Sequence, residues 1–124
     1  MKKIYNKLIR DKMINIYEHD IANKITATDF KVRYMGKDET LDRLKDKLLE
    51  EAQEVFDAYH DPDVQHLKEE IADVIEVIDA ILYHNDLSLA EVLEIRDKKK
   101  AKKGGFERGI FLESIEYIDG KEPK

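Results

Sequence analysis

The stretch Glu50-Glu51-Ala52-Gln53-Glu54, followed after a turn by Glu69-Glu70-Ile71-Ala72-Asp73, decides the fold of this chain. Apolar residues recur at helical spacing on both sides of the turn, over residues 41–59 and 67–82. Between them, His60-Asp61-Pro62-Asp63 supplies a helix stop and then an N-cap. The pattern predicts an αα-hairpin with an acidic cluster on each arm.

Two glutamates of these clusters fall on the apolar sides of their helices. At about 100° per residue, Glu51 lies inside the apolar arc of the first arm, and Glu70 lies inside that of the second. Glu54 and Asp73 follow three residues later, on the borders of the arcs, whereas Glu50 lies outside. Because residues i and i+3 share a helical face, each arm should turn two carboxylates toward the partner helix.

Four carboxylates in one seam need a compensating positive charge, because burial and mutual repulsion both penalise their ionised forms. Lys47, one turn before Glu51, neutralises only part of that charge. Mg²⁺ is a hard cation that takes oxygen ligands and keeps part of its water shell. We therefore predict a Mg²⁺ site, with Mn²⁺ as an alternative, held by Glu51, Glu54, Glu70 and Asp73. In a chain with 40% charged residues, the plainer alternative is that these residues only solvate amphipathic helices.

The acidic motif also resembles a known signature. Glu50-Glu51-x-x-Glu54, fifteen intervening residues and Glu70-x-x-Asp73 are similar to the EExxE and ExxD motifs of the all-α nucleoside triphosphate pyrophosphatases, the MazG-like superfamily. The opening Lys7-Leu8-Ile9-Arg10-Asp11-Lys12 resembles the Lys-Leu-Val-Arg-Asp-Lys string of one MazG-like subgroup, described as house-cleaning pyrophosphatases. The Lys-Gly-Gly-Phe segment that ends at Phe106 resembles the same subgroup.

Composition limits the classes of function. A chain of 124 residues fits a single domain over residues 1–124, small enough for association with further copies to complete its core. A formal net charge of −6 disfavours nucleic-acid polymers as partners. The absence of cysteine excludes disulfides, thiolate nucleophiles and cysteine zinc sites. No signal peptide or membrane span is evident, so we expect a cytoplasmic protein.

The remaining segments predict two further helices and a small β element. A short first helix should start near Arg10 or Asp11, and a third long helix should run from Ser88 to the lysine-rich segment that ends at Lys103. Apolar residues alternate over residues 30–34 and 110–118, which predicts a small two-stranded β element. The expected fold is mainly all-α, a MazG-like helical bundle built on the acidic hairpin.

The basic residues at the end of the third long helix suit two roles. Cations in a last helical turn before glycines interact favourably with the helix dipole. A cationic cluster in an acidic chain also suits contact with a polyphosphate, and Gly104-Gly105 permits close approach of the backbone. We predict phosphate contacts from Lys99, Lys103 and Arg108, with Lys12 as a further candidate.

Histidine chemistry is not indicated by the sequence. The four histidines (His19, His60, His66 and His84) share no ligand spacing, and we assign them surface or capping roles. No Ser/His/Asp arrangement and no P-loop is present, which excludes the commonest other phosphate chemistries.

The resemblance implies hydrolysis of a nucleoside triphosphate between its α- and β-phosphates, which yields a monophosphate and pyrophosphate. The catalytic residues would be Glu50, Glu51 and Glu54, with Glu50 orienting or deprotonating the attacking water. The resemblance also implies a homodimer or homotetramer that acts on the nucleotide pool. One alternative is phosphoribosyl-ATP pyrophosphohydrolase of histidine biosynthesis, which shares the acidic helices. The other is a non-catalytic helical oligomerisation module.

Overall fold

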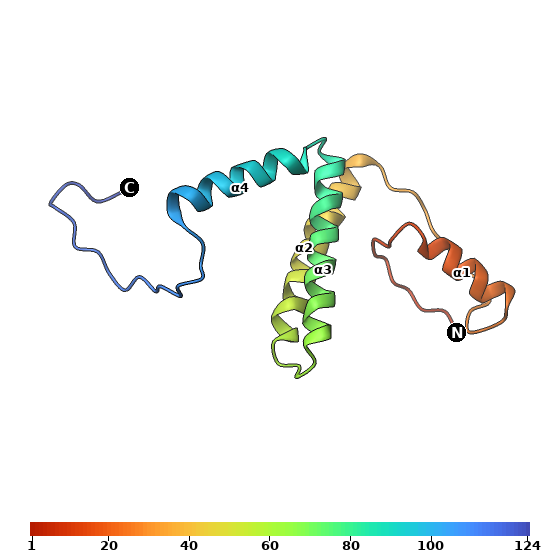
Figure 1. The fold of residues 1–124 in the computed structure, drawn as a ribbon. Coiled ribbons are helices and arrows are strands. Elements are labelled where there is room, and N and C mark those ends of the chain that lie inside the picture. Colours follow the sequence, from red (N-terminus) through yellow and green to blue (C-terminus); the bar gives the residue numbers. More distant parts are fainter. The chain divides into compact units, whose positions relative to one another are not determined.

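The computed structural model describes all 124 residues. They form four helices joined by irregular segments, and no strand (Figure 1). The helices are α1 (Met13–Ala22), α2 (Lys37–Ala58), α3 (Val64–His84) and α4 (Leu89–Lys103). This confirms the all-α prediction. None of the helices is both long enough and apolar enough to span a bilayer. The chain divides into two compact units, residues 1–89 and 90–124. A single domain over the whole chain stays a prediction.

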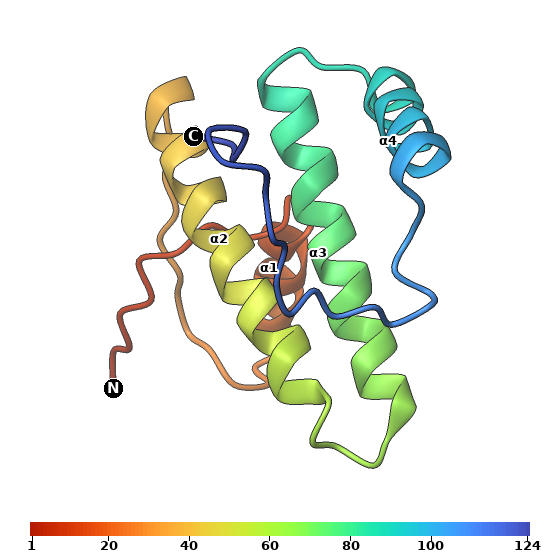
Figure 2. The same cartoon turned by 90° about the vertical axis from the view of Figure 1, so that its left-hand side faces the viewer.

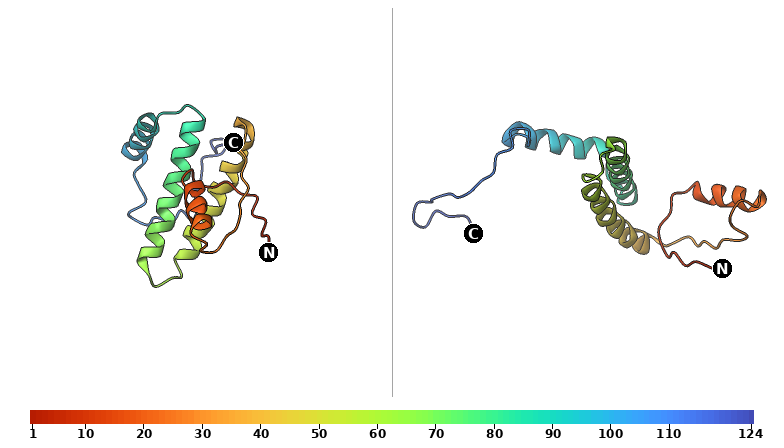
Figure 3. Two further views of the ribbon diagram at one scale, coloured as in Figure 1. Left: turned by 90° about the vertical axis from the view of Figure 1, so that its right-hand side faces the viewer. Right: turned by 90° about the horizontal axis from the view of Figure 1, so that it is seen from below.

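The predicted hairpin is formed by α2 and α3. The two helices run antiparallel and lie side by side in views from opposite sides (Figure 2 and Figure 3). Two aspartates shape the turn between them. The Asp61 carboxylate accepts a hydrogen bond from the Asp63 backbone N–H at 2.8 Å, and the Asp63 carboxylate caps α3 by accepting from the Gln65 N–H at 2.9 Å. This turn is therefore built by the residues that the sequence assigned to it.

The hairpin core is small. Four apolar side chains are buried, two from each arm: Leu44, Ala58, Val77 and Leu82. By contrast, Ile71, Ile75 and Ile78 of α3 keep 42%, 56% and 39% of their surface exposed. At spacings of four and three residues these isoleucines share one face of α3, so the first unit carries an uncovered apolar stripe.

The segment after α1 is tied back to that helix. The Asp20 carboxylate accepts hydrogen bonds from the Thr26 hydroxyl at 2.6 Å, the Thr26 N–H at 2.8 Å and the Ala27 N–H at 3.2 Å. These bonds lower the pKa of Asp20 below its ordinary value of 3.8, and the bond from the Thr26 hydroxyl has the largest effect. The helix itself begins at Met13, after a turn at residues 11–12, and thus slightly later than the sequence suggested.

The predicted two-stranded β element is absent. Residues 30–34 and 110–118 each have no regular structure. Alternating apolar residues form a strand only where the backbone finds a partner strand, and neither segment has one. Arg33 instead pairs with Glu39 in the first turn of α2, with N–O distances of 2.6 and 2.7 Å.

The second unit contains α4 from its second residue, Ala90, and the residues that follow the helix. The helix ends at Lys103, and Gly104 adopts a positive φ of 85° while its N–H donates to the Lys100 carbonyl at 2.8 Å. Glycine suits this left-handed position because it has no Cβ. Residues 103–110 then surround a small cavity of about 210 Å³.

Candidate metal centre

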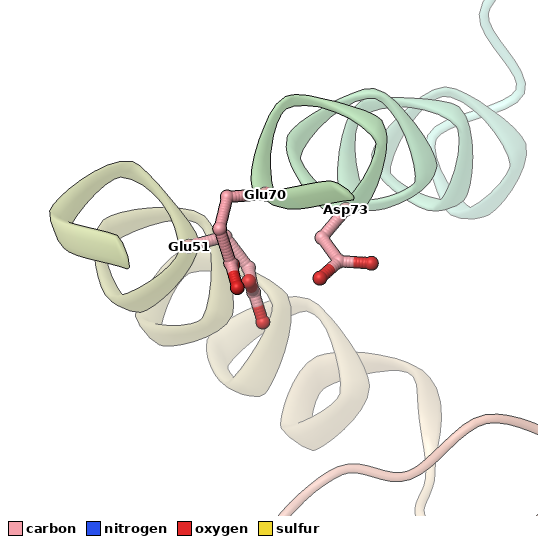
Figure 4. Close-up of side chains that lie close together, drawn as sticks. All are labelled: Glu51, Glu70 and Asp73. Atoms are coloured by element: carbon pink, nitrogen blue, oxygen red, sulfur yellow. The ribbon is translucent and has the colours of Figure 1, made fainter. Parts of the chain in front are cut away.

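Three carboxylates meet between the arms of the hairpin. Glu51 comes from α2, and Glu70 and Asp73 come from α3. One oxygen of each lies within 4.8 Å of one oxygen of each of the others. In Figure 4 the Glu51 and Glu70 side chains extend side by side from facing helices, while Asp73 turns toward the same space from the next turn of α3. The structure thus brings together three of the four predicted metal ligands.

Helical periodicity explains why these carboxylates face each other. Glu51 lies seven residues after Leu44 and seven before Ala58, and both of those side chains are buried on the hairpin-facing side of α2. Seven residues make nearly two turns, so Glu51 shares their face and keeps only 8% of its surface exposed. Glu70 stands in the same relation to Val77, a buried residue of α3.

Lys47 supplies a positive charge within α2. Its ammonium lies 3.2 Å from Glu51 Oε1 and 3.6 Å from Glu50 Oε1. Partial burial by itself lowers the pKa of Lys47, but the hydrogen bond to Glu51 and the charges of both carboxylates outweigh it, so the pKa is raised. Lys47 therefore stays charged beside the least exposed carboxylate of the centre.

His66 supplies a second basic group, on α3. Its Nε2 lies 3.2 Å from Glu70 Oε1, and its Nδ1 lies 3.0 Å from Asp61 Oδ2 in the hairpin turn. The hydrogen bond with Asp61 is the main cause that raises the pKa of His66, and the contact with Glu70 raises it further. Desolvation opposes this shift but does not cancel it. The sequence-based assignment of His66 to a surface or capping role missed this contact. Its spacing of four residues from Glu70 was the available signal.

Arg10 supplies the third basic group, from outside the hairpin. Its Nη2 lies 2.8 Å from Asp73 Oδ1 across 63 positions of sequence. Arg10 belongs to the opening string of residues 7–12, in which the sequence predicts Lys12 as the phosphate contact. Lys12 is exposed at the start of α1 and forms no ion pair. Its role in binding phosphate stays a prediction.

Glu54 and Glu50 lie outside the group of three. Glu54 is exposed on α2, one turn beyond Glu51, and its carboxylate does not join the cluster. The Glu50 side chain is 57% exposed beside Lys47. The metal-binding and catalytic roles assigned to Glu54, and the catalytic role of Glu50, stay predictions.

The remaining predicted phosphate contacts belong to the second unit. Lys99 is exposed on α4, and Lys103 and Arg108 both line the cavity around the Gly-Gly segment. The structure thus brings Lys103 and Arg108 to one small cavity. That they bind phosphate stays a prediction.

The donor set fits a hard divalent cation. All three side chains offer carboxylate oxygens, which Mg²⁺ and Mn²⁺ accept. Three carboxylate oxygens within 4.8 Å of one another, drawn from two facing helices, are therefore candidates to hold one such ion.

A model of the MazG nucleotide pyrophosphohydrolase domain matches residues 39–103, more than half of the chain. The chain belongs to the MazG family. The match contains all three clustered carboxylates and extends to the last residue of α4. Members of the MazG family are nucleotide pyrophosphohydrolases and typically depend on a divalent metal ion. The match therefore supports nucleotide pyrophosphohydrolase activity of this chain in general terms. No curated protein and no solved structure matches the chain.

Proposed function

We propose that this chain hydrolyses a nucleoside triphosphate between the α- and β-phosphates, releasing a nucleoside monophosphate and pyrophosphate. The supporting observation is the group of Glu51, Glu70 and Asp73, drawn from both arms of the hairpin within the segment that matches the MazG domain. Mg²⁺ is the proposed cofactor, and Mn²⁺ an alternative. The proposed role is the cytoplasmic removal of unwanted nucleotides from the pool.

The residues of the centre have different proposed roles, in metal binding and in activation of water. Glu51, Glu70 and Asp73 would hold the metal, and Glu54 would complete the ligand set. When bound, the metal neutralises charge on phosphate oxygens and lowers the pKa of a coordinated water. Glu50, solvent-facing and next in sequence to Glu51, would orient the attacking water and accept its proton.

The cations outside the hairpin are the proposed contacts to the phosphates. Lys99 and Lys103 lie within the part of α4 that the MazG model matches, and Arg108 shares a cavity with Lys103. Lys12 is the further candidate. A triphosphate carries several negative charges, so cations that approach its non-bridging oxygens lower the free energy of the bound substrate.

We also propose a homo-oligomer, a dimer or a tetramer. The support is the apolar stripe of Ile71, Ile75 and Ile78 on α3. Water-exposed isoleucine at helical spacing is unfavourable, and a second copy of the chain would bury it.

The experiment that tests this function is a screen of nucleoside triphosphates for pyrophosphate release, with Mg²⁺ and with EDTA. We expect release only with the metal, and we expect Glu51→Gln and Asp73→Asn to abolish it while the helical circular dichroism is unchanged. Glu69→Gln is the matched control, since Glu69 is exposed beside Glu70 and outside the group. Mg²⁺ should also raise the melting temperature of the wild type, whereas a non-catalytic module would be indifferent to metal. Full activity in both site variants at saturating Mg²⁺ would place the site elsewhere.

A further inference from the structure

Arg10 occupies a position unlike those of the other two basic groups at the centre. Lys47 and His66 each lie four residues before their carboxylate on the same helix, so helix geometry fixes them there. Arg10 lies in the irregular segment that precedes α1. Its contact with Asp73 is the one ion pair that reaches the three carboxylates from outside α2 and α3.

The Arg10–Asp73 pair lies at the solvent-open edge of the centre. The two side chains are 62% and 38% exposed, against 11% for the Glu51 side chain. One N–H of the guanidinium donates to Asp73, and a guanidinium has five such donors. The others remain available, in a planar fork whose geometry suits phosphate oxygens.

The charges near Arg10 would change on binding of a divalent cation and a polyphosphate at the centre. A divalent cation bound to Asp73 would neutralise the carboxylate charge that attracts Arg10, and it would also repel the guanidinium. A polyphosphate bound to that cation would bring new negative charge to the same edge of the centre. The favoured partner of Arg10 would therefore change from the carboxylate to the phosphate.

We propose that Arg10 is a phosphate-binding residue of this centre, which Asp73 holds in place until metal and polyphosphate are bound. This rests on the proposed function, since it needs a metal-bound polyphosphate substrate. The competing explanation is that Arg10 only tethers the N-terminal segment to the hairpin.

The two explanations predict different changes in the affinities for metal and for polyphosphate. Removing the charge of a phosphate-binding Arg10 should strengthen binding of the bare metal, because a competing cation is lost, and should weaken binding of polyphosphate. Removing a mere tether should change both affinities little, or lower both together with the melting temperature.

The test measures, on the full chain, the affinity for Mn²⁺ alone and the affinity for inorganic tripolyphosphate at saturating Mg²⁺, both by calorimetry. Tripolyphosphate carries no base or sugar, so the unknown nucleotide preference does not enter. For Arg10→Gln we expect Mn²⁺ to bind about threefold more tightly and tripolyphosphate to bind at least about tenfold more weakly. Arg10→Lys keeps the charge and the tether but not the fork, and should lie between.

Arg33→Gln is the matched control, because Arg33 also pairs with a carboxylate of the hairpin, Glu39, away from the centre. It should leave both affinities unchanged. If Arg10→Gln binds tripolyphosphate as the wild type does, or loses both affinities in parallel with its melting temperature, the role of Arg10 is overturned while the proposed function stands. If the wild type binds Mn²⁺ but no tripolyphosphate, the proposed function and the role of Arg10 fail together.

Discussion

The ammonium of Lys47 lies 3.2 Å from Glu51 Oε1, one helical turn away and at the most buried carboxylate of the centre. The geometry of α2 alone brings the two side chains together, because residues i and i+4 are neighbours on the surface of a helix. The contact therefore compensates the buried negative charge of Glu51 from within α2. Glu70 and Asp73 have basic partners of their own, so each of the three carboxylates has one.

Replacing Lys47 with methionine should expose the cost of that buried charge. Lys47→Met keeps much of the side-chain volume but leaves Glu51 without its close cation. We expect the metal-free protein to lose about 1–3 kcal/mol of stability. The gain in melting temperature on adding Mg²⁺ should be larger than in the wild type, since the metal replaces the missing charge. Lys45→Met is the matched control, because Lys45 forms an exposed pair with Asp42 on the same helix. Equal metal responses in the two variants would contradict the prediction.

The lysines of α4 can be tested by charge removal at constant helix propensity. Replacing Lys99 and Lys103 together by glutamine should lower kcat/KM by one to several orders of magnitude if both contact the triphosphate, at about 1.4 kcal/mol per tenfold. Stability should change by only a few tenths of a kcal/mol. The double variant of Lys98 and Lys102 removes the same charge from a neighbouring face of α4 and should keep nearly full turnover. Normal kinetics in the first double variant would remove Lys99 and Lys103 from the site.

The isoleucine stripe of α3 should control association. We expect the wild type to sediment as a dimer or tetramer at micromolar concentration. Replacing Ile75 with aspartate should yield monomer, because a charge would have to be desolvated in an apolar interface. Ile25→Asp is the control, since Ile25 is 62% exposed and lies outside the helices. Wild-type protein that sediments only as monomer would rule out the proposed oligomer.

The loop after α1 should respond to acid through Asp20. Because the native state lowers the pKa of this carboxyl, its ionised form contributes stability above the unfolded value of about 3.8. That contribution is lost as the pH falls through the lower, folded value. Asp20→Asn should therefore reduce the melting temperature near neutral pH, and the difference from wild type should shrink at pH values below 3.8. Thr26→Val, which removes one of the donors to Asp20, should raise the carboxyl pKa in an NMR titration. A melting-temperature difference that does not depend on pH would contradict this assignment.

The helices were predictable from the sequence because their evidence is local. Apolar residues at a spacing of three and four mark α2 and α3, and Pro62 with Asp63 marks the break between them. The two segments predicted as strands show where local pattern is insufficient. Residues 30–34 and 110–118 alternate in the required way, but strand formation also depends on a partner that no local pattern specifies.

The centre was partly predictable for the same reason. The placement of Glu51, Glu70 and Asp73 follows from counting residues around two helices. The contact of Arg10 with Asp73 does not, because 63 positions separate them and the irregular segment before α1 carries no periodicity. Contacts of that kind depend on how the chain returns to the hairpin, which a single sequence does not encode in any short motif.

The short turn of residues 59–63 also bears on when the centre can form during synthesis. All three carboxylates lie on the two helices that this turn joins, so no distant segment has to arrive before they meet. Contacts between neighbouring helices form early, because little chain entropy is lost in closing a short connection. We expect the metal centre to be competent soon after His84 has left the ribosome, while the lysine-bearing end of the chain is still being made.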